Sequence, residues 1–202
     1  PAAREDVAVI LMELYDKLRA PAVRSIGIIG AQEDLPDLTG YEVVGISAGK
    51  LMCAGKPAVP LSIDAGRAAA LQETIRQAGA KAFLHVVGGP TALNGDTGKT
   101  VAALAEAVKS GGYDGLLLDL EKLRLNQEAA MTRLMKALRP ALEGKPLYVI
   151  ADAPSWDGTV YEGYDYGLMG ENVDCLVLRI ASRADTSGEI PVAPMEPLEE
   201  AY

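Results

Sequence analysis

The segment Tyr113–Glu121, with the sequence YDGLLLDLE, restricts the fold of this 202-residue chain more than any other stretch. Its centre is a continuous apolar run, which is typical of a strand buried on both faces of a parallel sheet. The run ends in Asp119 and Glu121, which are two residues apart and therefore project from the same side of a strand. Carboxylates in this position either begin a loop that faces water or form a functional site, and the pattern alone leaves both interpretations open.

Similar apolar segments recur along the chain and alternate with segments of helical periodicity. The predicted strands are 25–30, 41–48, 81–89, 113–121, 147–152 and 175–181. The predicted helices are 4–19, 65–78, 98–109 and 128–142, with a helical turn at 168–171. This alternation predicts an α/β fold with a parallel sheet, either doubly wound or a (β/α) TIM-type barrel. A complete barrel needs about 250 residues, so a barrel of about six strands is incomplete.

Polar residues or glycines follow the carboxyl end of most predicted strands. They are Ser47, Gly88, Gly89, Asp119, Glu121, Asp152 and Ser182. Both candidate architectures place their functional sites at this edge of the sheet, so we expect the site there.

The composition argues against several classes of protein. The net charge of -9 argues against a nucleic-acid partner. The single histidine, His85, argues against a His-based zinc site, and its position within a strand predicts a core residue. Cys53 and Cys175 are predicted to be buried free thiols, with a disulfide between them left open. No apolar run reaches the length of a transmembrane helix, and no cofactor is implied. Because the chain begins at Pro1, we interpret it as a fragment or a processed product.

The segment Gly95–Thr100, with the sequence GDTGKT, resembles a phosphate-binding loop between a strand and a helix. Such a loop needs a glycine where this chain has Leu93, because the backbone must curl around the phosphates. The connection that starts at Gly88 is also too long for this motif. Nucleotide binding is therefore disfavoured.

The stretch Asp114–Glu121 resembles the DGxDxDxE signature of glycoside hydrolase family 18, the chitinase-like barrels. Residues 83–89 resemble the third strand of that family, which ends in a glycine pair. Residues 164–166 and 173–174 resemble the segment that leads into its sixth strand. Residues 191–202 resemble the stretch that follows in the spore-type, peptidoglycan-associated branch. The resemblance extends over residues 25–202 and favours the (β/α) barrel.

The resemblance implies a substrate-assisted retaining glycosidase that acts on polysaccharides containing N-acetylglucosamine, such as chitin or peptidoglycan. Glu121 would be the general acid, and Asp119 would orient the 2-acetamido group that acts as the nucleophile. A second carboxylate nearby favours the protonated form that a general acid needs. The implied substrate-binding residues are Asp114, Trp156, Tyr164 and Ser182, and Trp156 is equally suited to packing.

The sequence departs from the family pattern at positions that matter for catalysis. The family has Asp or Asn where this chain has Leu117, and a tyrosine that binds the acetamido oxygen where this chain has Ala181. The tryptophan of the eighth strand has no counterpart in the chain. The alternative is therefore a catalytically inactive module that binds glycan, cell wall or a surface layer.

Residues 1–20 are predicted to form a helix separate from the barrel domain at 21–202. The stretch Pro1–Ala8 resembles part of an S-layer homology repeat, although an amphipathic helix that packs on the barrel explains it equally well. The S-layer resemblance, like the glycosidase resemblance, implies an extracellular or cell-surface location in a bacterium. We expect the open edges of the barrel to be covered by the terminal segments, by a homodimer or by missing parts of a parent protein.

Overall fold

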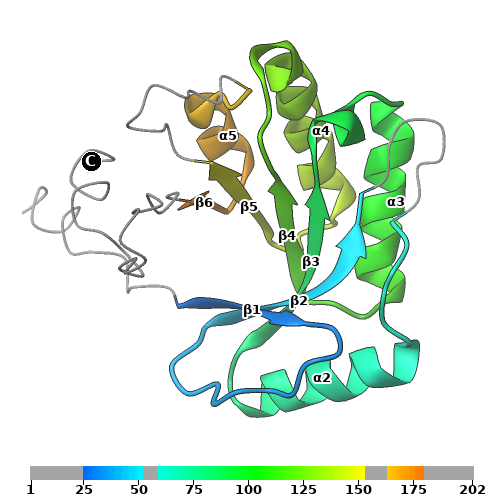
Figure 1. Ribbon diagram of the computed structural model, residues 1–202, viewed down its shortest axis with the longest axis vertical. Coiled ribbons are helices and arrows are strands. Elements are labelled where there is room, and N and C mark those ends of the chain that lie inside the picture. Colours follow the sequence, from blue (N-terminus) through cyan, green and yellow to red (C-terminus); the bar gives the residue numbers. More distant parts are fainter. Residues whose placement is uncertain (1–24, 52–58, 153–162, 180–202) are drawn as a thin grey trace, which may run out of the picture.

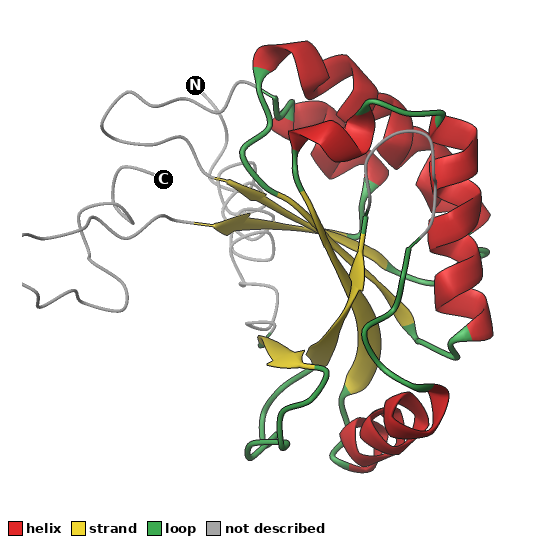
Figure 2. Cartoon of the chain, turned by 45° about the vertical axis from the view of Figure 1, so that its right-hand side comes forward, coloured by secondary structure: helices red, strands yellow, loops and turns green. Residues whose placement is uncertain are grey.

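The computed structural model describes residues 25–51, 59–152 and 163–179. They form one six-stranded parallel sheet with helices against its outer face (Figure 1, Figure 2). The strands are β1 (Ile26–Gly30), β2 (Val43–Lys50), β3 (Lys81–Gly88), β4 (Gly115–Leu120), β5 (Leu147–Asp152) and β6 (Cys175–Arg179). The helices are α2 (Ala65–Gln77), α3 (Thr97–Ser110), α4 (Glu128–Ala141) and α5 (Tyr166–Asn172), with short 3-10 turns η1 (Pro90–Leu93) and η2 (Leu125–Gln127). The helix predicted at 4–19 and the residues Cys53, Trp156, Ala181 and Ser182 lie outside the described residues.

The order of the strands in the sheet follows their order in the sequence, and every neighbouring pair is parallel. A doubly wound sheet reverses its strand order at a switch point, and this sheet does not. The strands curl into a half-barrel (Figure 2), which confirms the predicted incomplete (β/α) TIM-type barrel of about six strands. Within the described part of the chain, β1 pairs with β2 alone and β6 with β5 alone, so two edges stay open. The covering of these edges remains a prediction.

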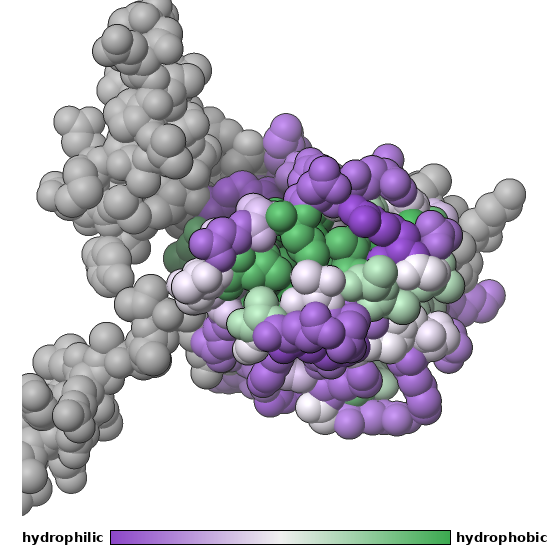
Figure 3. Space-filling view, turned by 90° about the horizontal axis from the view of Figure 1, so that it is seen from below, coloured by the Kyte–Doolittle hydropathy of each residue, from purple (hydrophilic) through white to green (hydrophobic). Residues whose placement is uncertain are grey.

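Each face of the sheet carries its own hydrophobic cluster. On the outer face, α3 and α4 bury residues such as Leu104 and Leu134 against the strands. The inner face carries a second cluster made of Val43, Phe83, Leu117, Tyr148 and Ile150. From below, the molecule shows an apolar area surrounded by polar side chains (Figure 3). Leu117 therefore belongs to a packed apolar layer, and Asp119 lies two residues further along the same face.

Aspartate side chains cap the amino ends of α2, α3 and α5. Asp64 caps α2 by accepting a hydrogen bond from the Arg67 N–H at 2.9 Å. Asp96 caps α3 by accepting a hydrogen bond from the Lys99 N–H at 3.2 Å. The GDTGKT segment thus contains an ordinary helix N-cap, which accounts for its acidic residue without a bound phosphate.

Two further aspartates, each just before a strand, both link a helix to the sheet. Asp114, just before β4, accepts a hydrogen bond from the Ala82 N–H of β3 at 2.9 Å. It also forms a bidentate ion pair with Arg76 of α2. Asp174, just before β6, accepts a backbone N–H of β5 at 2.9 Å and pairs with Arg139 of α4 at 2.8 Å. Each carboxylate therefore joins the last turn of a helix to the start of the following strand.

We expect Asp114→Ala to lower the free energy of unfolding by about 2 kcal/mol at pH 7, because a backbone N–H and a guanidinium lose their acceptor. Burial disfavours the charged form, but hydrogen bonds from Arg76 and Ala82 outweigh it and hold the pKa of Asp114 below its usual value. This stabilisation is present above the unfolded-state pKa of about 3.9 and is lost as the pH falls through the folded-state pKa. Urea unfolding at pH 7 and pH 3 measures the effect, and an equal loss at both pH values would contradict the account.

Candidate functional site

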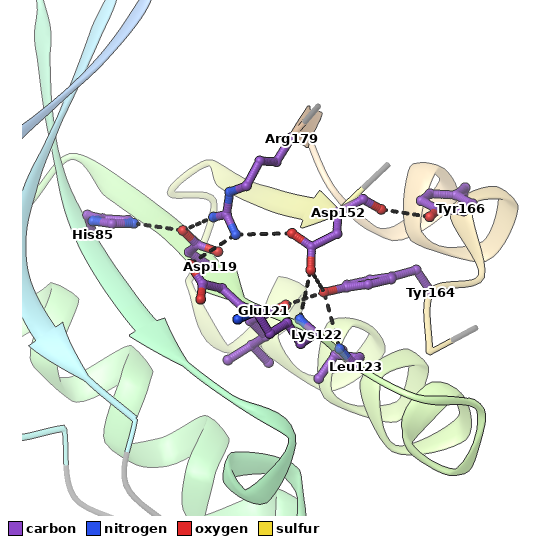
Figure 4. A network of polar contacts seen from close by, with 10 residues as sticks. His85, Asp119, Glu121, Lys122, Leu123, Asp152, Tyr164, Tyr166 and Arg179 are labelled. Atoms are coloured by element: carbon purple, nitrogen blue, oxygen red, sulfur yellow. Dashed lines mark hydrogen bonds and ion pairs between the residues drawn. The ribbon is translucent and has the colours of Figure 1, made fainter. Parts of the chain in front are cut away.

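Four charged side chains meet at the carboxyl edge of β4, β5 and β6, on the inner side of the half-barrel (Figure 4). Asp119 and Glu121 come from the end of β4, Asp152 ends β5, and Arg179 ends β6. Because parallel strands place their carboxyl ends at one edge, residues far apart in the sequence meet here. Asp119 is 4% exposed and Asp152 is 8% exposed, so this cluster includes two nearly buried carboxylates.

Arg179 is the centre of the cluster because it pairs with all three carboxylates. Its Nη1 lies 3.0 Å from Glu121 Oε1 and 3.1 Å from Asp152 Oδ1. Its Nη2 donates a hydrogen bond to Asp119 Oδ2. Buried carboxylates are costly unless a cation and hydrogen bonds compensate them, and one guanidinium supplies both. The site is thus built around an arginine.

His85 lies on the other side of Asp119, with its Nε2 atom 3.6 Å from Asp119 Oδ2 (Figure 4). His85 is 4% exposed, and neither ring nitrogen has a hydrogen-bond partner in the described part of the chain. Asp119 Oδ1 is also buried and has no hydrogen-bond partner among the same residues. Such unpaired polar atoms are rare in protein interiors.

The pKa of Asp119 is lowered by its surroundings. Burial disfavours the charged form, but the contacts with His85 and Arg179 outweigh this and keep the pKa below its usual value. Asp119 is therefore a carboxylate at neutral pH. Glu121 also contacts the guanidinium, at 3.0 Å, and its side chain is 48% exposed. Asp119 and Glu121 thus share one cation, Arg179.

Tyr164 and Asp152 hold the loop that follows β4. The Tyr164 hydroxyl donates to the Leu120 carbonyl oxygen at 2.6 Å, lies 3.1 Å from Asp152 Oδ2 and accepts the Leu123 N–H at 3.5 Å. Asp152 Oδ2 also accepts the N–H of Lys122, whose φ of 56° turns the chain sharply here. Burial and the nearby carboxylate of Asp152 raise the pKa of Tyr164. Its hydroxyl is thus part of the support of the site, beneath the acid cluster.

We expect Tyr164→Phe to lower the free energy of unfolding by about 1–3 kcal/mol, because the Leu120 carbonyl and the Leu123 N–H lose a buried partner while the ring is retained. Tyr166→Phe is the matched control, because the Tyr166 hydroxyl makes one hydrogen bond, to the Asp152 carbonyl oxygen at 2.7 Å, and is less buried. Thermal and urea unfolding of both variants measure the difference. A larger loss in the control than in Tyr164→Phe would contradict this role.

The structure brings together only part of the predicted site. Asp119 and Glu121 lie side by side as predicted, whereas Asp114 lies at the opposite end of β4. Tyr164 lies beside the cluster but is 5% exposed. Trp156 and Ser182, also predicted to bind substrate, are outside the described residues.

Arg179 was not among the predicted site residues, whereas Asp152 was expected at the functional edge of the sheet and His85 in the core. The signal for Arg179 was a charged side chain at the end of an otherwise apolar strand, opposite a strand that ends in two acids. The described residues contain no group of three or more His, Cys, Asp or Glu side chains that could hold a metal ion. No helix in the same part of the chain is long and apolar enough to cross a membrane.

Comparison with known proteins identifies the fold. No family model matches the chain, and no curated protein matches its sequence. Among solved structures, a chitinase from Chromobacterium violaceum superposes with a TM-score of 0.67 at 15% identity, over 88% of this chain and 62% of its own. The spore cortex-lytic enzyme SleL of Bacillus megaterium gives 0.68 at 14% identity, over 88% and 46%. A chitinase from Bacteroides thetaiotaomicron gives 0.68 at 13% identity, over 88% and 60%. The chain therefore shares the fold of these two chitinases and of the spore cortex-lytic enzyme, and it spans about half to three fifths of their length.

Proposed function

We propose that this domain binds N-acetylated glycans at the carboxyl edge of β4, β5 and β6, and that Arg179 keeps it from cleaving them. The observation that carries the proposal is the buried Oδ1 atom of Asp119, which has no hydrogen-bond partner among the described residues, next to a guanidinium that occupies the other carboxylate oxygen. An acceptor in this state requires an N–H or O–H donor. The amide of an acetamido sugar supplies an N–H donor.

The choice of ligand rests on the structural neighbours. They include chitinases and a spore cortex-lytic enzyme, and one of them, YKL-39, was solved in the presence of chitooligosaccharides. We propose that this chain is a divergent relative of glycoside hydrolase family 18, in its spore- and peptidoglycan-associated branch. An extracellular or cell-surface location in a bacterium is part of the same proposal.

The absence of cleavage follows from what a general acid has to do. Glu121 would have to hold a proton and give it to the glycosidic oxygen, but its carboxylate pairs with Arg179 at 3.0 Å. Asp119 would have to orient the acetamido group, but one of its oxygens is bound by the same guanidinium. An arginine between the two acids therefore opposes both roles.

Substrate-assisted hydrolysis with Glu121 as general acid is the second candidate. It is favoured by one observation, which is that Asp119 and Glu121 remain together at the functional edge of a glycosidase-like barrel. A ligand that displaces Arg179 would free both acids. The two candidates share the glycan and differ in whether it is cut.

Isothermal titration calorimetry with an N-acetylglucosamine tetramer tests the binding site. We expect Asp119→Ala to weaken binding by about 10- to 100-fold, the value of one hydrogen bond to a charged group. Asp114→Asn is the matched control, because it changes an acid of the same strand at the opposite edge, and we expect an unchanged Kd. Cellotetraose, which lacks acetamido groups, is the ligand control. Equal loss in both variants, or equal affinity for both sugars, would overturn the proposed site.

A further inference from the structure

We infer that His85 is a positioning residue that fixes the carboxylate of Asp119 through its Nε2 atom. Three facts about the inner face of the half-barrel carry this inference, and it deepens the proposed function because it concerns the same site. Packing alone does not explain why a polar side chain is buried at position 85, and positioning of Asp119 does.

The first fact is that His85 has a polar side chain without a conventional partner. His85 is 4% exposed, and neither ring nitrogen makes a hydrogen bond to a described residue. Burying an unsatisfied imidazole is unfavourable, so a residue that only filled space would be better apolar. The polar atom that lies near it is Asp119 Oδ2, at 3.6 Å from Nε2.

The second fact is the position of His85 in the sheet. It pairs in register with Leu117, and the next inner-facing residue of β4 is Asp119. Leu117 belongs to the apolar inner cluster and offers Asp119 no hydrogen bond from below. His85 therefore supplies polar contact on the β3 side of the carboxylate, and Arg179 supplies it from β6.

The third fact is that both contacts favour the same oxygen. His85 and Arg179 both approach Oδ2 of Asp119, which leaves Oδ1 without a donor. Two groups that both contact one oxygen of a carboxylate favour a single orientation of that carboxylate. Without the imidazole, rotation of the carboxylate would let Arg179 engage both oxygens.

The chain has a single histidine, so its ring signals are observed without interference from other imidazoles. In ¹⁵N NMR spectra at pH 7.5 we expect shifts that place the proton on Nε2, facing Asp119, and a clear change in Asp119→Asn. Glu121→Gln is the matched control, because it removes one negative charge from the same cluster without a contact to His85. Equal changes in both variants, or no change in either, would overturn the inference. This result does not depend on glycan binding.

The second arm measures affinity for the N-acetylglucosamine tetramer. We expect His85→Phe to weaken binding about tenfold and His85→Gln, which keeps an N–H donor, to stay within about threefold of wild type. In the Asp119→Ala background the same two substitutions should have equal affinity, because the group they position is gone. Unequal affinity in that background would assign His85 another role. Wild-type protein that does not bind the sugar would refute the proposed function, while the NMR arm would still decide the role of His85.

Discussion

Replacing Arg179 with Met is expected to lower the free energy of unfolding by about 3 kcal/mol at pH 7. The substitution keeps an unbranched side chain of similar length and removes the cation shared by Asp119, Glu121 and Asp152. Removing one partner of a buried ion pair typically costs about 3–5 kcal/mol, because it leaves uncompensated charge. The lower end applies here, since the Arg179 side chain is 33% exposed.

The pH dependence of this loss follows from the lowered pKa of Asp119. In the wild-type protein, His85 and Arg179 outweigh burial and hold this pKa below its usual value. The resulting stability is present above the unfolded-state pKa of about 3.9 and is lost as the pH falls through the folded-state pKa. Arg179→Met raises the folded-state pKa of Asp119, so the difference between the two proteins should shrink as the pH falls below 4. Urea unfolding at pH 7 and pH 3 measures it, and a constant difference would contradict the account.

Removing the ring of Phe83 is expected to cost about 3–5 kcal/mol, the range for deleting a large aromatic side chain from a core. Phe83 is fully buried and packs edge-on against Tyr148, with ring centroids 4.9 Å apart. It also lies over Gly115, where an added Cβ atom would come within 2.5 Å of the ring. Phe83→Ala thus removes one ring from the apolar layer beneath the acid cluster, and the urea concentration at the midpoint of unfolding should fall accordingly.

Gly115→Ala supplies the control for this packing. In the wild-type background we expect it to cost about 1–3 kcal/mol, because the new methyl group overlaps the Phe83 ring. In the Phe83→Ala background the same change should cost little, since the ring is absent. The double-mutant cycle measures this coupling directly. Additive losses would show that the glycine is needed for a reason other than Phe83.

The sequence predicts the strands well because their signal is local. Each predicted strand in the described part matches a strand of the structure, and the apolar character of both faces reflects an outer and an inner cluster. The open half-barrel also follows from the number of strands. The departure at Leu117 is explained by packing, because this residue belongs to the inner apolar layer.

The site is predicted less completely because its contacts depend on the register and curl of the sheet. Arg179 and Asp119 are 60 residues apart, and their contact crosses β5. Nothing in the local sequence indicates that the arginine reaches back to the acid pair. Asp114 illustrates the opposite case, since it belongs to the resembling motif but fastens β3 and α2 at the other end of the strand.

The most direct test of the central claim is to incubate the wild-type protein and Glu121→Gln with an N-acetylglucosamine tetramer and with peptidoglycan, and to measure bound sugar and released products. We predict that both proteins bind and that neither releases products, because Arg179 occupies the acid pair. Products released by the wild-type protein but not by Glu121→Gln would contradict the claim and establish Glu121 as the general acid.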